Sequence, residues 1–518
     1  MNEKLRHVSF RALGTSEVHL RYLEDDPEIK DVLGPRAHDA RELFRHAPLD
    51  ARRLVSASEL GAAMEAYAVR HGGSAASIEN ARAIGRGEAL AIVTGQQPGL
   101  FGGPLYSIHK AATAIRLARA IAALPDGPRV VPVFWNHSDD HDLDEANRAF
   151  LVNPNQDLQR FRVDVTHNGE SLRNLAIGRA LERTLAAADD LLPRTEFREQ
   201  VLKVFAPQHQ DETFGDGFAR LLFALFGDDG LVVIEPRDLP RSAFDVLPRW
   251  RAQHNAIRGK MRAISDHLSD LGFEPTLDPG TPLMFHVAPG QPRVALADDE
   301  GFDDASKLSP GVLLRPLWQD AVLPSIAFVV GPGELQYLAV VAGLYKLLGV
   351  PRTVLVPRAS LTLLEPSLRK HLDRFGWDLP DLAAGPDALA ATLGDESASV
   401  AERELEALLA EVRARCDAAD ADLREGDAAM VGPLERARLK VVDEVDRLLN
   451  KLRNSRQNRQ GTGLRQIRRL CANLRPRGRP QERVLPILPF LVTHGFGIGK
   501  AIIDAADPFG VQHGVLEL

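Results

Sequence analysis

The stretch from Ala91 to Asn147 restricts the possible fold more than any other part of the chain. It opens with the β-branched run Ala91–Thr94, which predicts a buried strand, and continues into a glycine-rich turn over Gly95–Pro104. Apolar residues then recur at every third or fourth position from Leu105 to Ala118, which is the spacing of a helix packed on one face. The apolar run Val130–Trp135 predicts a second buried strand. Strand, helix and strand in this order indicate a βαβ unit with parallel strands.

Polar and glycine residues follow both predicted strands, at the ends where parallel sheets bind ligands. Glycine takes positive φ at little cost, so the first turn can bring bare backbone close to a ligand, and a helix start offers N–H groups to an anion. The candidate binding residues of this turn and helix are Gly95, Gln96, Gln97, Gly99, Gly103 and Tyr106, with Lys110 as a candidate catalytic residue. A purely structural strand-to-helix turn is the alternative interpretation.

The turn after the second strand concentrates three carboxylates and an imidazole in Asp139-Asp140-His141-Asp142. Histidine titrates near neutral pH, and adjacent carboxylates can orient it, so His141 with Asp140 and Asp142 is a candidate for moving a proton. Two other interpretations stay open, namely a divalent metal site and a solvated acidic loop that caps the next helix.

A second βαβ unit is predicted further along the chain. Strands are expected at Ser325–Val330 and Thr353–Val356, with a helix from Leu335 to Leu348 between them. The candidate binding residues at these strand ends are Gly331, Gly333, Glu334, Arg358 and Ser360. Arg315 and Arg358 are lone cations in apolar surroundings, which favours either a buried ion pair or an anionic substrate.

The two βαβ units predict an α/β protein with a doubly wound, mostly parallel sheet. A third core strand is expected at Leu231–Ile234, and the turn signal Asn168-Gly169 predicts a hairpin after an alternating strand over Leu158–Val165. The predicted divisions are a helical segment over 1–88, core over 89–150, 206–240 and 313–366, insertions over 151–205 and 241–312, a helical arm over 367–480, and a return to the core over 481–518.

The arm shows a heptad rhythm, which is typical of an antiparallel coiled coil. Its expected seam positions are Leu405, Leu409, Val412, Cys416, Ala419 and Leu423 on one helix, and Leu434, Val441, Val445, Leu448 and Leu452 on the next. A solvated arm and an arm that forms a dimer are both compatible with this pattern.

Composition narrows the class of function. The net charge of −8 gives no electrostatic case for nucleic acid, and no apolar run reaches the roughly 18 residues of a membrane span. Only two cysteines occur, Cys416 and Cys471, which indicates a reducing compartment. With no signal-peptide pattern at the N-terminus, we expect a cytoplasmic protein without membrane or nucleic-acid partners.

At these same residues the chain resembles the bacillithiol biosynthesis enzymes of the BshC type. The resemblance rests on the blocks Thr94–Leu100, Gly103–Tyr106 with Lys110, Val133–Trp135 with Asp140–Asp142, Leu313–Pro316, Gln319-Asp320, Gly331–Glu334, Pro357–Ser360 and Pro486–Leu491. It implies a Rossmann-like core related to class I aminoacyl-tRNA synthetases, with connective insertions and a coiled-coil arm that helps to form a homodimer. Two departures from the family pattern are His137 and Asp139, and the His-Ile-Gly-His signature of the synthetases is absent.

The resemblance also implies an activity, namely a ligase that joins cysteine to glucosaminyl-malate through an amide bond. Such a bond requires activation of a carboxyl group, most simply by ATP, and a divalent metal stays open. We expect the glycine-rich turn to hold phosphate or carboxylate oxygens, Lys110 to offset charge at the activated carboxyl, and His141 to accept the amine proton. Arg315 and Arg358 are expected to hold the malate carboxylates. A nucleotidyltransferase with another acceptor and a non-catalytic nucleotide-binding scaffold are the alternatives.

Overall fold

The computed structural model describes residues 4–49, 54–273, 277–392, 400–460 and 462–518, without the side chains of 454–462. The chain divides into two compact units. The first comprises residues 1–151, 160–365 and 479–518, and the second comprises 152–159 and 366–478. Each unit is described by itself below.

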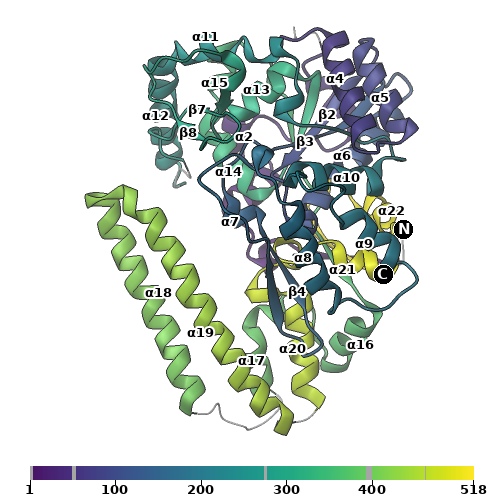
Figure 1. Ribbon diagram of the computed structural model, residues 1–518, viewed down its shortest axis with the longest axis vertical. Coiled ribbons are helices and arrows are strands. Elements are labelled where there is room, and N and C mark those ends of the chain that lie inside the picture. Colours follow the sequence, from purple (N-terminus) through teal and green to yellow (C-terminus); the bar gives the residue numbers. More distant parts are fainter. Residues whose placement is uncertain (1–3, 50–53, 274–276, 393–399, 461) are drawn as a thin grey trace. The chain divides into compact units, whose positions relative to one another are not determined.

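A five-stranded parallel sheet forms the centre of the first unit (Figure 1). Its strands, in spatial order, are β11 (Val354–Pro357), β10 (Ser325–Val330), β2 (Leu90–Gln96), β3 (Val130–Asn136) and β6 (Val232–Ile234). These are the strands predicted from the apolar runs, and the α/β, Rossmann-like fold class is confirmed. The short segments are almost entirely apolar because both faces of a parallel sheet are covered.

The register of the sheet brings its polar strand ends into line. Gln96 lies opposite Asn136, and Trp135 opposite Ile234, so Glu235 follows at the same edge. Val330 lies opposite Pro357, which places Gly331 beside Arg358. The chain winds from β2 outward to β3 and β6, then returns to β10 on the other side of β2. The boundary between β2 and β10 is therefore the topological switch point, where open α/β sheets bind ligands.

Helix α6 (Tyr106–Ala122) covers one face of this sheet and connects β2 to β3. Its Ala114, Leu117 and Ile121 are fully buried against Ile92 of β2 and Ile326 of β10. Helix α3 (Ala40–His46) adds Leu43 to the same cluster. Packing against the sheet explains why the helix carries apolar residues at every third or fourth position.

The other helices of the first unit surround the sheet and its insertions. They are α1 (Glu17–Leu23), α2 (Pro27–Leu33), α4 (Ala57–Arg70), α5 (Ala75–Gly85), α7 (Leu143–Ala146), α8 (Gly178–Asp189), α9 (Arg198–Phe205), α10 (Phe214–Phe226), α11 (Leu247–Arg251), α12 (His254–Asp270), α13 (Arg315–Val322), α14 (Pro332–Val341), α15 (Leu344–Leu348), α21 (Leu488–His494) and α22 (Ile498–Ala505).

The single helix predicted from Leu335 to Leu348 is interrupted, since α14 ends at Val341 and α15 begins at Leu344. Gly343 lies at the interruption, where an added Cβ would stand 2.6 Å from Cε of Lys260 and 2.7 Å from Cδ1 of Ile264. A side chain at the break would therefore have to displace the ends of these two side chains of α12.

The insertions contain short antiparallel sheets. Strand β4 (Arg148–Val152) pairs with β5 (Leu158–Arg162), and β7 (Met284–His286) lies between β8 (Val294–Ala295) and β9 (Leu308–Pro310). The prediction of a hairpin turn at Asn168-Gly169 is wrong, because β5 pairs with the strand before it. The connecting loop is stabilised instead by Asn153, whose Oδ1 accepts the backbone N–H of Asp157 at 2.9 Å.

The C-terminal residues complete a second sheet of the first unit. Strand β13 (Gln512–Glu517) lies between β1 (Leu5–Ser9), to which it is antiparallel, and β12 (Leu361–Leu364), to which it is parallel. Residues 479–518 thus return to the unit that contains the parallel sheet.

The second unit is helical, with α16 (Pro366–Phe375), α17 (Gly385–Ala391), α18 (Val400–Gly426), α19 (Val431–Gln460) and α20 (Thr462–Leu474). Helices α18 and α19 pack along one another, with Leu409, Val442 and Leu449 buried at their seam. The predicted seam of α18 is confirmed at Leu405, Leu409 and Val412.

On α19 the predicted seam is partly wrong, since Val441 is 45% exposed and Leu448 is 48% exposed. Val445 lies at the seam as predicted, whereas Val442 and Leu449 occupy it in place of Val441 and Leu448. Adjacent apolar pairs, Val441-Val442 and Leu448-Leu449, made two registers possible in the sequence.

No helix among the described residues is long and apolar enough to cross a membrane.

Candidate functional site

Lys110 holds the two halves of the sheet together at the switch point. Its side chain is 2% exposed, and Nζ donates to the backbone oxygen of Gly95 at 2.8 Å and to Oε1 of Gln96 at 2.9 Å. It also forms an ion pair with Glu334, whose carboxylate accepts the N–H of Gly331 at 2.7 Å. An ammonium group has three donors, and all three have acceptors here. The structure therefore brings together the strand ends of β2 and β10 through Lys110.

Arg315 lies next to this cluster with fewer partners. It occupies the first position of α13, where a cation opposes the helix dipole. Within the described part of the chain, its guanidinium donates one hydrogen bond, to the hydroxyl of Tyr337 at 3.4 Å. No carboxylate among the described residues lies within 4 Å of it. Asp140 and Glu334 interact with it at longer range. Most donors of this half-buried guanidinium therefore have no direct partner among the described residues, which leaves them available to an anionic ligand.

Arg358 has the opposite environment. Its guanidinium donates to both carboxylate oxygens of Glu482, at 2.7 and 2.6 Å. The same carboxylate accepts from the Ser360 hydroxyl at 2.7 Å and is bonded to the His109 imidazole at 2.9 Å. Burial opposes the charge on Glu482, but Arg358 and His109 hold the pKa of that carboxyl well below its usual range. Of the two explanations for a lone arginine in the sequence, the structure shows the buried ion pair for Arg358.

The polar turn after β3 distributes its carboxylates among different partners. Asp139 is 1% exposed and pairs with Arg173 at 2.8 Å. Asp142 caps α7, accepting the N–H of Glu145 at 3.1 Å, and its backbone oxygen accepts from Gln97 at 3.1 Å. The capping interpretation of this turn therefore applies to Asp142, while the Gln97 contact links the turn to the glycine-rich loop.

Asp140 and His137 lie in the interior of the turn. Burial opposes ionisation of Asp140, but the neighbouring side chain of His141 and the guanidinium of Arg293 hold the pKa of this carboxyl well below its usual range. Burial lowers the pKa of His137 well below its ordinary value, so this imidazole is neutral at physiological pH. Its buried Nδ1 has no hydrogen-bond partner among the described residues.

His141 lies at the mouth of the turn, and its side chain is 42% exposed. Its Nδ1 is 3.2 Å from Nη1 of Arg293 and 3.5 Å from Oδ1 of Asp140. The ring packs against Phe285 of β7, with 6.0 Å between centroids. Phe285 of β7 and Arg293, just before β8, belong to the second insertion, and no local pattern in the sequence distinguishes them from neighbouring residues.

The candidate glycines serve different purposes. A Cβ on Gly95 would stand 2.7 Å from the backbone oxygen of Trp135, and one on Gly99 would stand 2.9 Å from Cα of Gly103. These positions need glycine for packing within the first unit. In contrast, a Cβ on Gly333 would meet no described atom within 4 Å, so the first turn of α14 presents open backbone beside Glu334.

The start of α6 is less open than the sequence indicated. The N–H groups of residues 105 and 107–109 already donate to carbonyl oxygens, among them that of Leu485 at 2.9 Å. Tyr106 packs its ring 5.6 Å from the guanidinium carbon of Arg358, and burial raises the pKa of its hydroxyl.

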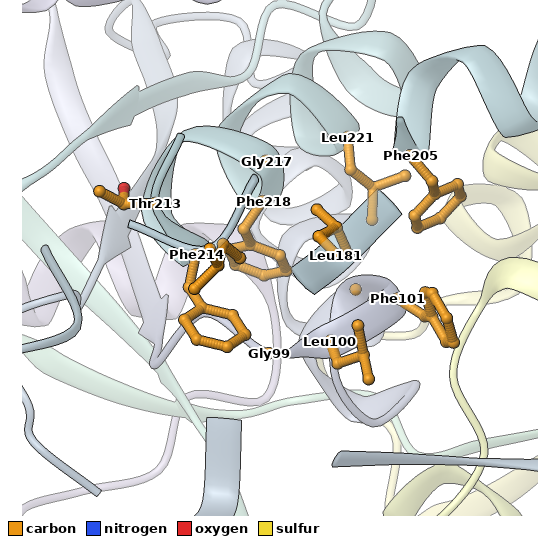
Figure 2. Close-up of a pocket in the computed structure, with 12 residues that line it drawn as sticks. Gly99, Leu100, Phe101, Leu181, Phe205, Thr213, Phe214, Gly217, Phe218 and Leu221 are labelled. Atoms are coloured by element: carbon orange, nitrogen blue, oxygen red, sulfur yellow. The ribbon is translucent and has the colours of Figure 1, made fainter. Parts of the chain in front are cut away.

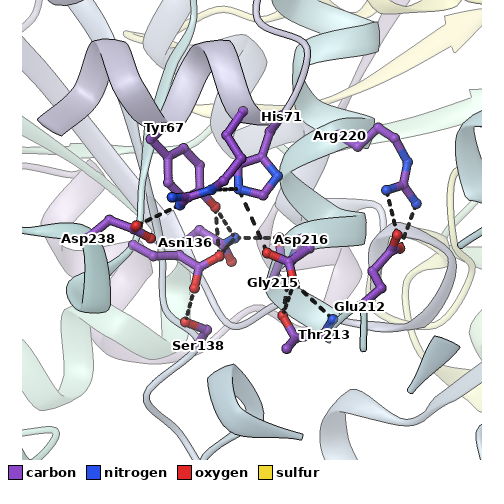
Figure 3. A network of polar contacts seen from close by, with 12 residues as sticks. Tyr67, His71, Asn136, Ser138, Glu212, Thr213, Gly215, Asp216, Arg220 and Asp238 are labelled. Carbon is purple, nitrogen blue, oxygen red and sulfur yellow. Dashed lines mark hydrogen bonds and ion pairs between the residues drawn. The ribbon is translucent and has the colours of Figure 1, made fainter. Parts of the chain in front are cut away.

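A polar network centred on the buried carboxylate of Glu235 contacts the turn through Ser138 (Figure 3). Glu235, directly after β6, accepts hydrogen bonds from the Tyr67 hydroxyl at 2.7 Å and the Ser138 hydroxyl at 2.6 Å, and it pairs with Arg237 at 2.9 Å. Burial raises the pKa of Glu235 to about 7, although Arg237 lowers it. Tyr67 comes from α4, so the N-terminal helices contribute to this network. Pairs separated by so many residues left no local signal in the sequence.

The glycine-rich loop also borders a small apolar cavity of about 30 Å³. Figure 2 shows Phe214, Phe218 and Leu181 around it, opposite Leu100 and Phe101. This volume is about that of one water molecule, so the cavity is too small for a substrate. No group of three or more His, Cys, Asp or Glu side chains suited to a metal ion occurs within the described ranges.

Fold and geometry together define the class: a Rossmann-like α/β protein whose polar groups converge at the switch point of a parallel sheet, with a helical coiled-coil domain. Family comparison agrees with this class. The profile of the "Bacillithiol biosynthesis BshC, N-terminal Rossmann-like domain" matches residues 4–306 and 299–359, and that of the "Bacillithiol biosynthesis BshC, C-terminal coiled-coil domain" matches 361–518. The chain belongs to the BshC family of bacillithiol biosynthesis.

Individual relatives cover most of the chain. Proteins named "Putative cysteine ligase BshC" from Koribacter versatilis and Heliobacterium modesticaldum are 32% and 31% identical over 463 and 508 residues. The alignments cover 84% and 88% of this chain and 85% and 90% of the relatives. A protein of the same name from Salinibacter ruber is 30% identical over 433 residues, which is 78% of each chain.

Proposed function

We propose that this protein is a cysteine ligase of bacillithiol biosynthesis, which joins the carboxyl group of cysteine to the amine of glucosaminyl-malate. The observation that carries the proposal is Arg315 near the switch point, which interacts with Asp140 at longer range and has no direct carboxylate partner among the described residues, in a chain of the BshC family. Both proposed substrates bear carboxylates, which are the ligands that a guanidinium binds best.

Amide formation from a free carboxylate is uphill in water, so we propose that ATP first activates the carboxyl group of cysteine as a phosphate or adenylate. In the joining step, the amine nitrogen forms a bond to the activated carbonyl carbon, and the C–O bond to the leaving group breaks with its electrons. The amine then releases a proton to solvent water. Negative charge develops on the carbonyl oxygen before the leaving group departs, and donors aimed at that oxygen lower the barrier.

The described side chains suggest a division of roles. Arg315 is proposed to hold a substrate carboxylate, and the open backbone at Gly333 to receive phosphate or carboxylate oxygens at the start of α14. His141 is proposed to face the reacting groups, because its ring is the accessible one in the turn. Lys110 is assigned to fixing the strand ends, since its donors are already used.

The direct test mixes purified protein with ATP, cysteine and glucosaminyl-malate and follows the thiol product by mass spectrometry and the release of AMP or ADP. We expect product only when all three substrates are present. Pyrophosphate release that does not depend on cysteine would favour a nucleotidyltransferase with another acceptor. Nucleotide binding without turnover would favour a scaffold protein.

Substitution of His141 by alanine tests the site. We expect product formation to fall by about 10²–10³, the typical loss for one group acting on the transition state. The thermal midpoint should stay unchanged because the ring is partly exposed. More than a tenth of wild-type activity in this variant would remove His141 from the reaction.

The helical arm is proposed to form a homodimer. Its outward apolar side chains include Leu439, Val441 and Leu448 of α19, which are 36%, 45% and 48% exposed. Light scattering on the full chain should give twice the mass of 56.7 kDa. The double variant Val441→Glu, Leu448→Glu should give the monomer mass, whereas an unchanged mass would exclude this face of the arm.

A further inference from the structure

Arg293 of the second insertion contacts the imidazole of His141 and the ring of Phe285. Its Nη1 is 3.2 Å from Nδ1 of His141, and its guanidinium carbon lies 3.6 Å from the centre of the Phe285 ring. The backbone N–H of Arg293 donates to the oxygen of Gly169 at 2.7 Å. Stacking holds the guanidinium and the backbone bond holds the main chain of this residue, so the arginine is kept in place against the imidazole.

The contact determines which nitrogen of a neutral His141 carries the proton. An arginine side chain only donates hydrogen bonds, and a neutral imidazole has one N–H and one acceptor nitrogen. Because Arg293 donates to Nδ1, that nitrogen must be the acceptor. The proton then lies on Nε2, on the side of the ring away from Arg293.

Asp140 is the group that could impose the opposite tautomer, since a carboxylate accepts from Nδ1–H. Its Oδ1 is 3.5 Å from Nδ1, which is an ion-pair distance rather than a hydrogen bond. That oxygen already accepts the backbone N–H groups of His141 at 2.7 Å and of Asp142 at 3.3 Å. Arg293 is therefore the better-placed partner of the ring nitrogen.

We propose that Arg293 is a positioning residue that fixes His141 as the Nε2–H tautomer, so that His141 donates a hydrogen bond to negative charge on the activated carboxyl group. This inference rests on the proposed ligase function and deepens it. It replaces the proton-accepting role expected for His141 from the sequence, because the Nε2 of this tautomer has no lone pair to offer. The oxygen that receives the bond is the one on which charge develops during attack.

The tautomer can be observed without any substrate. The full chain, labelled with ¹⁵N-histidine, is recorded in a long-range ¹H–¹⁵N correlation experiment at a pH where His141 is neutral, and the His141→Asn variant assigns its signals among the 16 histidines. We expect a protonated Nε2 and an unprotonated Nδ1. A protonated Nδ1 in the wild-type protein would overturn the proposal.

Arg293→Met keeps an apolar stem over Phe285 and removes the donors. In this variant we expect His141 to shift toward the Nδ1–H tautomer facing Asp140, with kcat lower by about 10- to 100-fold and KM nearly unchanged. Arg293→Lys keeps a donor and should restore part of both. An unaltered tautomer in Arg293→Met would contradict the proposal, whatever the activity.

Arg241→Met is the matched control, because Arg241 lies on the same insertion and pairs with Asp304 on the surface. It should leave the His141 signals and the kinetics unchanged. The two proposals fail separately. The predicted tautomer without any ligase activity would reject the function alone, and ligase activity with an Nδ1–H tautomer would reject the positioning role alone.

Discussion

A comparison of the surroundings of Arg358 and Arg315 distinguishes a structural ion pair from a candidate ligand-binding arginine. Around Arg358, one carboxylate receives the arginine, a serine and a backbone N–H in a closed cluster. Around Arg315, a hydroxyl at 3.4 Å is the one hydrogen-bond partner among the described residues, and the neighbouring carboxylates are more distant. Both arginines follow apolar segments, and both looked alike in the sequence. What separates them is whether the folded chain itself neutralises the charge.

The largest expected effect is on the closed cluster. Arg358→Met leaves Glu482 buried without its cation, which should lower the free energy of unfolding by about 3–5 kcal/mol. Denaturant titration followed by circular dichroism measures it. A loss below about 1 kcal/mol would show that the cluster is not a structural ion pair.

Arg315→Met should affect activity rather than stability. We expect kcat/KM for a carboxylate substrate to fall by about 10²–10³, corresponding to roughly 3–4 kcal/mol, because the substrate loses its charged partner. The free energy of unfolding should change little, because no carboxylate among the described residues pairs directly with this guanidinium. Arg315→Lys serves as the control, as it keeps the charge without the paired donors. An equal loss of unfolding free energy in Arg358→Met and Arg315→Met would contradict the proposed difference between the two arginines.

Glu235 extends the comparison to pH. Its folded pKa of about 7 lies above the ordinary value of 4.5, so between these values the folded state holds a proton that the unfolded state has lost. Stability should therefore decrease as pH rises from about 4.5 to 7, by up to roughly 3 kcal/mol from this group. Glu235→Gln should remove that part of the slope. Parallel stability curves for the two proteins would refute the assignment.

Ser360→Ala gives the smallest expected change. The hydroxyl donates to Glu482 at 2.7 Å and contacts the ring of His513 at 2.9 Å, so its loss should cost about 1–2 kcal/mol of unfolding free energy. Ligase kinetics should not change, because Ser360 belongs to the closed cluster. A raised KM would instead return Ser360 to the substrate site predicted from the sequence.

Local patterns were sufficient for the sheet and for the location of the polar strand ends. The runs at 91–94, 130–135 and 325–330 are apolar because both sheet faces are covered, and parallel pairing then determines which ends meet. The roles of the individual side chains at those strand ends could not be predicted from the sequence. The hydrogen bonds that use all three donors of Lys110, and the pairing of Arg358 with Glu482, depend on contacts between residues far apart in the chain.

The same limit explains the errors in detail. Val441 and Val442 are equally apolar, and only the packing of α18 against α19 decides which one is buried. Arg293 carries no motif, and its importance arises because a loop from one insertion ends beside a turn after β3. Asp142 followed by Glu145 fits a helix start, so its capping role was the part of this turn that the residues could indicate.

The two insertions are joined to each other as well as to the sheet. Pro292 forms a β-bridge with Glu170, and the N–H of Arg293 binds Gly169. When segments are exchanged between BshC relatives to alter substrate choice, both insertions should therefore be exchanged together. In a hybrid that carries only one of them, the guanidinium of Arg293 would no longer be placed against the imidazole of His141, even if every strand of the sheet were intact.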